Sequence, residues 1–182
     1  RIVAIDLEAV LQAPDVVAVL TAKDIPGIND IAPTPTHDDP LFADKVVQYI
    51  GQSIFAVVAT SRDAARAATK LARITYEDLP AIITIDQALA AKSYLEPPYV
   101  MQRGDADAAI AAAEHIISGT IDIGGQEHFY LETQGALAIS GEDEDMLVHS
   151  SSQHPTEIQH KVAEVLGIAA HAVTVEVRRM GG

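Results

Sequence analysis

Short runs of apolar or alternating residues recur along the chain and predict β-strands. In the first half these runs occupy residues 1–6, 16–21, 52–60 and 73–77. In the second half they occupy residues 117–123, 134–140, 145–151 and 172–180. The alternation is clearest at 117–123, where isoleucines and one glycine share one face and polar residues share the other. We therefore expect short strands throughout the chain.

Segments with helical periodicity lie between these runs, at residues 7–13, 62–72, 84–91, 106–115 and 155–167. The last is the strongest, because Pro155 suits the first position of a helix and Gly167 suits its C-terminal cap. Its predicted apolar face consists of Ile158, Val162, Val165 and Leu166. A mixture of strands and helices in this order predicts an α+β (mixed α/β) fold.

Two stretches without periodicity interrupt the pattern. Residues 24–45 hold four of the nine prolines and predict a long ordered loop. Residues 93–105 contain a Pro-Pro pair and lose the pattern altogether, as is typical of a domain boundary. We therefore predict two domains, residues 1–95 and residues 96–182.

Composition and charge narrow the classes of function. Apolar residues make up 48% of the 182 residues, which is enough for a hydrophobic core. The net charge of −14 argues against nucleic acid and anionic membranes as partners, and no apolar run reaches the ~20 residues of a membrane span. Cysteine is absent, which excludes disulfides and thiolate metal sites and fits a cytoplasmic location. The chain begins without Met and ends directly after a predicted strand, so we expect a piece of a longer protein.

The residues best suited to binding a ligand or to catalysis lie in "GGQEHFYLE", residues 124–132. The motifs of serine hydrolases, P-loops and dinucleotide sites are absent, and the histidines lack metal-ligand spacing. Gly124 and Gly125 would let a ligand approach the backbone, and Gln126 offers an uncharged hydrogen-bond donor. A strand bend or β-bulge with residues 129–131 in the core explains the same segment and is the stronger interpretation on local grounds.

Three other features have simple structural explanations. The acidic residues 142–145 between two predicted strands indicate a solvated hairpin tip. The serines at 150–152 end a strand and precede a helix, so capping or turn formation accounts for them. The final "RRMGG" places glycines directly after a strand, where either a ligand or an ordinary turn could be found.

Taken together, "GGQEHFYLET", "SSQHPTEIQHKVAEVLG" and "VTVEVRRMGG" resemble the molybdenum-binding subunit of xanthine dehydrogenases and the related aldehyde oxidases. Upstream, "DIPGIND", "YIGQSIFAVVATS" and "YEDLPAI" resemble the α/β-hammerhead domain of that family. The resemblance runs through nearly the whole chain in order. It implies a hammerhead domain at residues 1–95, without its N-terminal strand, followed by the beginning of a molybdopterin-binding domain at residues 96–182.

The resemblance also implies a cofactor, a molybdenum ion held by a pyranopterin, so that the protein supplies no direct metal ligand. Gln126 would hydrogen-bond the oxo ligand of the metal. Gly124, Gly125, Gly181 and Gly182 would allow the backbone to lie against the cofactor. No catalytic residue is expected within the chain, because the general base of the family lies beyond Gly182.

By the same resemblance, the parent enzyme hydroxylates purines, converting hypoxanthine and xanthine to urate with oxygen taken from water. Its electrons pass to iron–sulfur clusters and FAD in another domain or subunit, and the whole complex is expected to be a homo-oligomer. We expect the chain by itself to be inactive. Two alternatives stay open, an aldehyde oxidase of the same family and a non-catalytic interaction or scaffold domain without cofactor.

Overall fold

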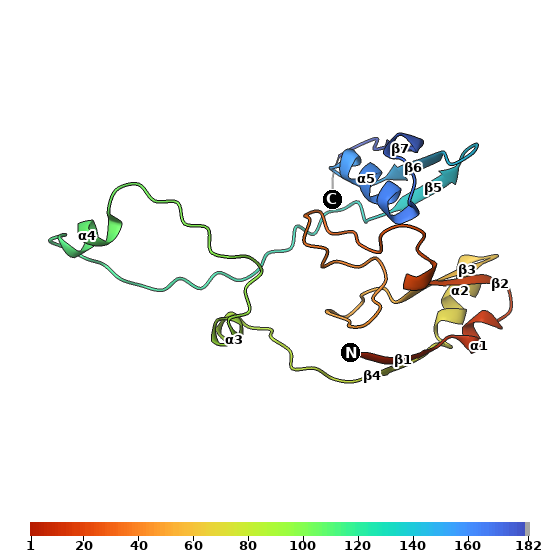
Figure 1. Ribbon diagram of the computed structural model, residues 1–182, viewed down its shortest axis with the longest axis horizontal. Coiled ribbons are helices and arrows are strands. Elements are labelled where there is room, and N and C mark those ends of the chain that lie inside the picture. The colour runs from red at the N-terminus through yellow and green to blue at the C-terminus, as the bar shows by residue number, and fades with distance from the viewer. Residues whose placement is uncertain (181–182) are drawn as a thin grey trace. The chain divides into compact units, whose positions relative to one another are not determined.

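The computed structural model describes residues 1–180, and these residues form two compact units. One unit consists of Arg1–Leu79 together with the chain from His128 onward, and the other of Pro80–Glu127. The prediction of a mixed α+β fold is confirmed, since helices and strands alternate along the chain (Figure 1). The hollow described below lies in the first unit.

The N-terminal part of the first unit contains two antiparallel strand pairs. Strand β1 (Ile2–Asp6) pairs with β4 (Arg73–Tyr76), and β2 (Val16–Thr21) pairs with β3 (Phe55–Ala59). The helical elements are α1 (Glu8–Leu11), the 3-10 turn η1 (Ala22–Asp24) and α2 (Arg62–Thr69). Ser61 accepts a hydrogen bond from the Ala64 N–H, so it is the N-cap of α2.

The loop between η1 and β3 is held by side chains that take the place of strand pairing. Asn29 bonds the backbone of Phe42 twice, donating from Nδ2 to the carbonyl at 2.8 Å and accepting the N–H at Oδ1 at 2.9 Å. Asp30 is buried, and its carboxylate accepts the backbone N–H of Asp39 at 3.3 Å and lies 3.2 Å from the His37 ring. The expected ordered loop is therefore confirmed, and it buries the apolar Ala32, Phe42 and Ala43 beside the polar Asp30.

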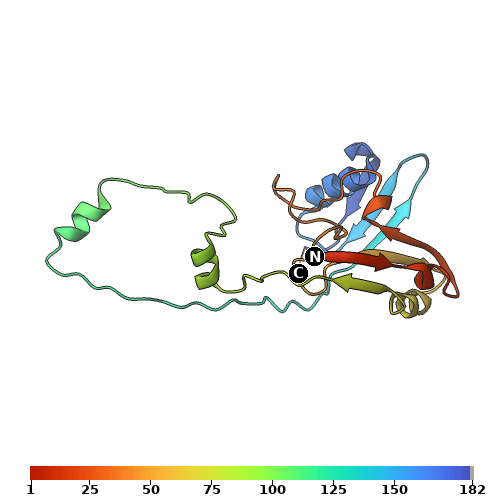
Figure 2. The same ribbon diagram turned by 60° about the horizontal axis from the view of Figure 1, so that its bottom comes forward.

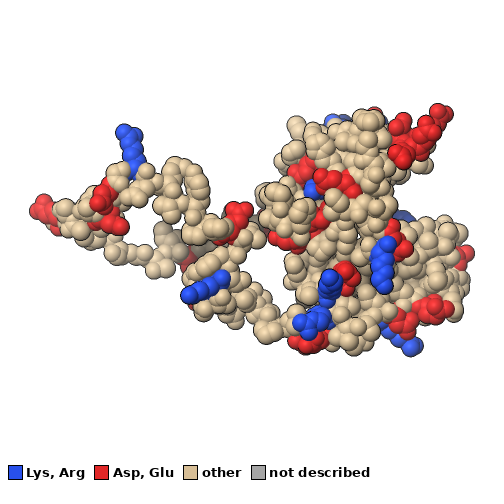
Figure 3. All heavy atoms as spheres, in the orientation of Figure 1, with Lys and Arg blue, Asp and Glu red and all other residues tan. Residues whose placement is uncertain are grey.

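The C-terminal part of the first unit is a three-stranded sheet with a helix across one face (Figure 1). Strands β5 (Ala136–Ser140) and β6 (Met146–Ser150) form an antiparallel hairpin, and β6 pairs in parallel with β7 (Val173–Glu176). Helix α5 (Pro155–Leu166) and the turn η2 (Ala170–Ala172) connect β6 to β7. The acidic residues 142–145 form the exposed tip of the hairpin, as expected, and appear in red at the upper right of Figure 3.

The core beneath α5 uses much of the predicted apolar face. Val148 of β6, Ala163 of α5 and Val173 of β7 are buried together, and Ile158 and Val162 pack against them. The helix begins at Pro155 and is capped by Gly167, whose φ of 69° is in the left-handed region. His154 is the N-cap, because its ring Nδ1 accepts the N–H of Glu157 at 3.1 Å.

The C-terminal end of α5 contacts the proline-rich loop. The N–H groups of Gly27 and Ile28 donate to the carbonyls of Val165 and Glu164, both at 2.9 Å. Carbonyls in the last turn of a helix lack a full set of partners within it. The Gly27 N–H therefore completes Val165, and the Ile28 N–H adds a second bond to the Glu164 carbonyl, which also accepts the Gly167 N–H at 3.3 Å.

The second unit contains two short helices, α3 (Ile85–Ala91) and α4 (Ala106–Ala111), joined by extended chain (Figure 2). Thr84 and Asp105 cap them, as the sequence indicates for Asp105. The strand predicted at residues 117–123 is wrong for this structure, since the segment pairs with no strand among the described residues. Ile121 and Ile123 are more than 80% exposed. Alternation predicts the faces of a strand, but a strand also needs a neighbour for its backbone groups.

Candidate functional site

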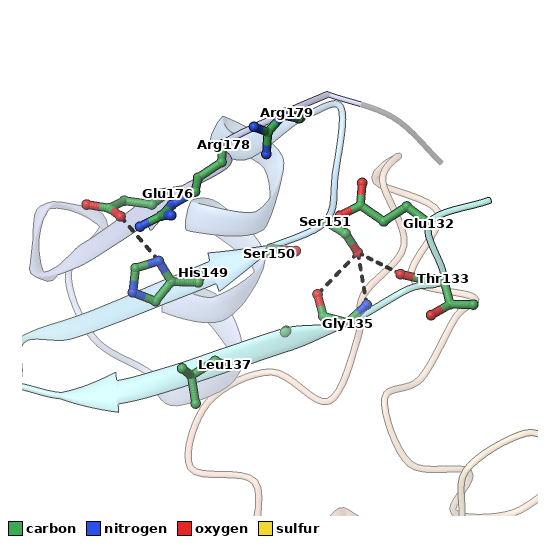
Figure 4. Close-up of a pocket in the computed structure, with 11 residues that line it drawn as sticks. Glu132, Thr133, Gly135, Leu137, His149, Ser150, Ser151, Glu176, Arg178 and Arg179 are labelled. Atoms are coloured by element: carbon green, nitrogen blue, oxygen red, sulfur yellow. Dashed lines mark hydrogen bonds and ion pairs between the residues drawn. The ribbon is translucent and has the colours of Figure 1, made fainter. Parts of the chain in front are cut away.

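A hollow of about 560 Å³ lies on the first unit where β6 and β7 end and β5 begins (Figure 4). Its lining comes from segments far apart in sequence, residues 132–137, residues 149–151 and the chain from Glu176 to Arg179. The first segment directly continues "GGQEHFYLE", and the last directly precedes the terminal "MGG". The two motif regions named from the sequence therefore end at one place on the protein.

Ser151 joins the first of these segments to the end of β6 (Figure 4). Its Oγ accepts the N–H of Gly135 at 2.9 Å and lies 3.2 Å from the Gly135 carbonyl and 3.3 Å from the Thr133 carbonyl. A hydroxyl has one proton, so it donates to one of these two carbonyls at a time. The Ser151 N–H also donates to the Gly135 carbonyl at 3.0 Å. Residues 133–135 are thus fixed to the strand end before the β5 pairing begins.

The charged groups of the hollow come mainly from the β7 side. His149 and Glu176 face each other across the β6–β7 pair, with 3.2 Å between Nδ1 and the carboxylate. Arg178 and Arg179 follow after Val177, and neither makes an ion pair with any residue of the described chain. Guanidinium groups stay charged at all ordinary pH values and offer several fixed donors. This side of the hollow could therefore hold an anionic group.

The predicted site residues lie partly within the described chain. Gln126, Gly124 and Gly125 lie in an exposed, extended part of the second unit. A Cβ built on either glycine would meet no heavy atom within 4 Å, and neither glycine has a positive φ. Gly181 and Gly182 lie outside the described residues.

The alternative interpretation of this segment, with residues 129–131 in the core, is not what the structure shows. Phe129 is 93% exposed and Leu131 is fully exposed, while Tyr130 is about two-fifths exposed and its hydroxyl accepts a hydrogen bond from Gln134. Phe129 also has a φ of 51°, which bulky residues rarely adopt. Local apolar character alone therefore did not predict burial here.

The structure adds residues that sequence reasoning missed. Ser152 does form a turn as expected, accepting the N–H of His154 at 3.0 Å, but Ser151 instead bonds the segment that follows the "GGQEHFYLE" motif. In the sequence, Arg178 and Arg179 stand out only as neighbours of the terminal glycines. Among residues 1–180, no three His, Asp or Glu side chains gather as a metal site would require. None of the described helices is long and apolar enough to cross a membrane.

Comparison with known families gives two matches that together span almost the whole chain. Residues 1–80 match the aldehyde oxidase and xanthine dehydrogenase a/b hammerhead domain, and residues 90–182 match the molybdopterin cofactor-binding domain. The xanthine dehydrogenase of Dictyostelium discoideum is 41% identical over the whole chain, and so is aldehyde oxidase 1 of Bos taurus. The chain spans only 13% and 14% of the length of these two relatives.

Solved structures show the same fold over the whole chain. The aldehyde oxidoreductase of Desulfovibrio gigas gives a TM-score of 0.84 at 29% identity, with this chain covering 22% of that chain. The quinoline 2-oxidoreductase of Pseudomonas putida 86 gives a TM-score of 0.82 at 27% identity, with 25% of that chain covered. The chain belongs to the aldehyde oxidase and xanthine dehydrogenase family, and carries sequence of its hammerhead and molybdopterin cofactor-binding domains.

Proposed function

We propose that the chain is part of the molybdenum-binding subunit of a xanthine dehydrogenase-type hydroxylase, whose parent enzyme oxidises purines with water as the oxygen source. Family membership and relatives that are oxidoreductases by name support the reaction class. We further propose that the hammerhead domain ends near residue 95 and the cofactor-binding domain begins near residue 96. The observation that supports the site assignment is the match of residues 90–182, which include Gly124, Gly125 and Gln126, to the molybdopterin cofactor-binding domain.

Those glycines have no role that the described fold explains. Glycine is required where φ is positive or where a Cβ would clash, and neither applies to Gly124 or Gly125. By contrast, a Cβ on Gly27 would lie 2.0 Å from the Glu164 carbonyl oxygen, so the fold itself needs that glycine. Gly119 and Gly135 are equally open, so the surroundings of Gly124 and Gly125 permit a ligand to approach the backbone, and the family match is what favours these two. We infer that Gly124 and Gly125 make room for the cofactor beside Gln126.

Arg178 and Arg179 fit an anionic organic cofactor in charge, and the carboxylates of Glu132 and Glu176 line the same hollow. Arg178 and Arg179 supply positive charge without a partner in the described chain, and Ser150 supplies a hydroxyl at the same wall. A volume of about 560 Å³ is in the ordinary range of small-molecule sites. We propose that these residues contribute to binding the cofactor, together with Gly181 and Gly182, and that no side chain of residues 1–180 ligates the metal directly.

In this proposal the cofactor, when bound, supplies the oxygen-transfer and electron-accepting chemistry. Gln126 would offer the bound cofactor an amide N–H donor without adding negative charge, which a carboxylate at that position would add. An uncharged donor held in place before reaction stabilises developing negative charge at no cost of reorganisation. The general base is proposed to lie in sequence beyond Gly182.

The test of this assignment is Gln126→Ala in the full-length parent enzyme. We expect turnover to fall by roughly 10- to 1,000-fold, the range for loss of one preorganised donor. Gln102→Ala is the matched control, since that exposed side chain bonds only the nearby Gly104 carbonyl. Wild-type turnover of Gln126→Ala would show that Gln126 has no part in catalysis.

An aldehyde oxidase is the second candidate, because relatives of the two kinds are equally similar at 41% identity. Steady-state hydroxylation of xanthine and of an aromatic aldehyde by the parent enzyme separates the two. Purification of the parent without molybdenum or pterin would instead favour a non-catalytic interaction domain. The proposed iron–sulfur and FAD partners, homo-oligomer and cytoplasmic location are tested by metal and flavin analysis, light scattering and cell fractionation of the same protein.

A further inference from the structure

We propose that Ser151 is a positioning residue that fixes the segment after the Gln126 loop, so that the loop returns to the sheet at one defined point. The consequence for the cofactor rests on the function proposed above. The fixing of the segment itself rests only on contacts within the first unit.

The hydroxyl of Ser151 takes the place of a backbone acceptor at the end of the β5–β6 ladder. Strand β6 ends at Ser150, which pairs with Ala136 of β5, so the ladder stops before Gly135. One step further, the Ser151 N–H donates to the Gly135 carbonyl at 3.0 Å, as in a continuing ladder. The Gly135 N–H, however, is accepted by the Ser151 Oγ at 2.9 Å rather than by a backbone carbonyl. The side chain thus extends the pairing by one residue after the backbone has turned away.

The same oxygen also reaches Thr133, two residues before Gly135. Its separation of 3.3 Å from the Thr133 carbonyl places that residue within hydrogen-bond reach of the strand end. Because the hydroxyl accepts from Gly135 and donates to Thr133 or Gly135, a single side chain fixes both the position and the direction of the segment. Alanine at this position would keep the backbone bond of residue 151 and lose both side-chain contacts.

The segment that Ser151 fixes forms part of the wall of the hollow, so a shift of this segment would change the shape of the hollow. Glu132, Thr133 and Gly135 line the hollow together with Arg178 and Arg179. Gln126 precedes Glu132 along the chain by a single short stretch, so residues 133–135 are the point at which its loop rejoins the sheet. Displacement of a catalytic group by about 1 Å can cost on the order of 100-fold in rate. Because the segment that Ser151 fixes lines the hollow, loss of the hydroxyl can affect turnover through the walls of the hollow without touching substrate.

The experiment compares Ser151→Ala, Ser151→Thr and Ser140→Ala in the full-length parent enzyme. Threonine retains the hydroxyl, and Ser140 is an exposed serine at the other end of β5 that makes no side-chain hydrogen bond with a described residue. The first readout is hydrogen exchange of the Gly135 amide. We expect faster exchange in Ser151→Ala and exchange as in the wild type in the other two variants. Unchanged protection in Ser151→Ala would overturn the proposal.

The second readout separates positioning from general loss of structure. We expect Ser151→Ala to keep its molybdenum content, to lower kcat by roughly 10- to 100-fold with KM changed less, and to alter the molybdenum electron paramagnetic resonance signal. Ser151→Thr should restore all three. A wild-type kcat and spectrum in Ser151→Ala would overturn the link to Gln126. If the wild-type parent contains no molybdenum, the proposed function fails, and the exchange of Gly135 alone then decides whether Ser151 fixes the segment.

Discussion

Replacement of Gly27 by alanine should detach the proline-rich loop from the end of α5. A Cβ at this position would lie 2.0 Å from the Glu164 carbonyl oxygen, 2.7 Å from the Gly167 nitrogen and 2.9 Å from the Val165 carbonyl oxygen. All three atoms belong to the backbone, so no side-chain rotation relieves the clash. The loop must move away, and the hydrogen bonds from Gly27 and Ile28 to the helix must lengthen or break.

The expected cost follows from the two bonds lost. Each backbone hydrogen bond contributes about 0.5–1.5 kcal/mol net, so Gly27→Ala should lower the free energy of unfolding by about 1–3 kcal/mol. The cost should stay within this range because the freed carbonyls of Glu164 and Val165 can then bond water. For a chain of this size, each kcal/mol corresponds to a fall in Tm of about 2–4 °C.

Urea unfolding followed by circular dichroism measures the loss of stability, and hydrogen exchange of the Gly27 and Ile28 amides locates it. Gly119→Ala is the matched control, because its added Cβ would meet nothing within 4 Å and its φ is not positive. Equal stability of Gly27→Ala and Gly119→Ala, with Gly27 and Ile28 still protected, would refute the contact. A loss of protection across the whole first unit would show that the loop supports more than the helix end.

Two further predictions concern capping and pH. Because the His154 ring accepts the Glu157 N–H, His154→Ala should lower the free energy of unfolding by about 0.5–2 kcal/mol, and His154→Ser should restore most of the loss in the same urea assay. Hydrogen bonds from the Thr21 backbone N–H and then its hydroxyl hold the pKa of Asp24 below its ordinary value of 3.8. The folded state therefore gains stability above that value and loses it as the pH falls through the lowered pKa. Asp24→Asn should remove this part of the acid dependence, and an unchanged stability-against-pH curve would contradict it.

Elements that depend mainly on residues close together in the sequence could be predicted from it. Helix α5 begins at Pro155 and is capped by Gly167 because both conformations are preferred by those residues wherever they occur. The β5–β6 hairpin follows from two apolar runs around an acidic turn. The parallel pairing of β6 with β7 has no such signal, since it depends on a helix returning the chain to the same sheet.

Contacts between distant segments account for what the sequence could not predict. In the sequence, Pro26-Gly27 resembles an ordinary turn. Only the contact with α5 shows why a glycine is needed there. From the sequence Ser151 resembles a turn-forming serine like its neighbour Ser152, because the residues that Ser151 contacts, 133–135, are distant along the chain. By contrast, the alternation at residues 117–123 predicts a strand, but none of the described strands pairs with this segment.

The contrast among glycines separates those that the described fold requires from those, Gly119 and Gly135 included, that it leaves open. Gly27 and Gly167 are required by the described fold, one by close packing and the other by a positive φ. Gly124 and Gly125 meet neither requirement, although each carries the same entropic cost in the unfolded chain. Substituting alanine at Gly27 should therefore reduce stability, whereas alanine at Gly125 should leave stability unchanged and impair cofactor retention by the parent enzyme. If Gly125→Ala instead reduced stability as much as Gly27→Ala, the glycine pair would be structural, and the argument that links it to a cofactor would lose its basis.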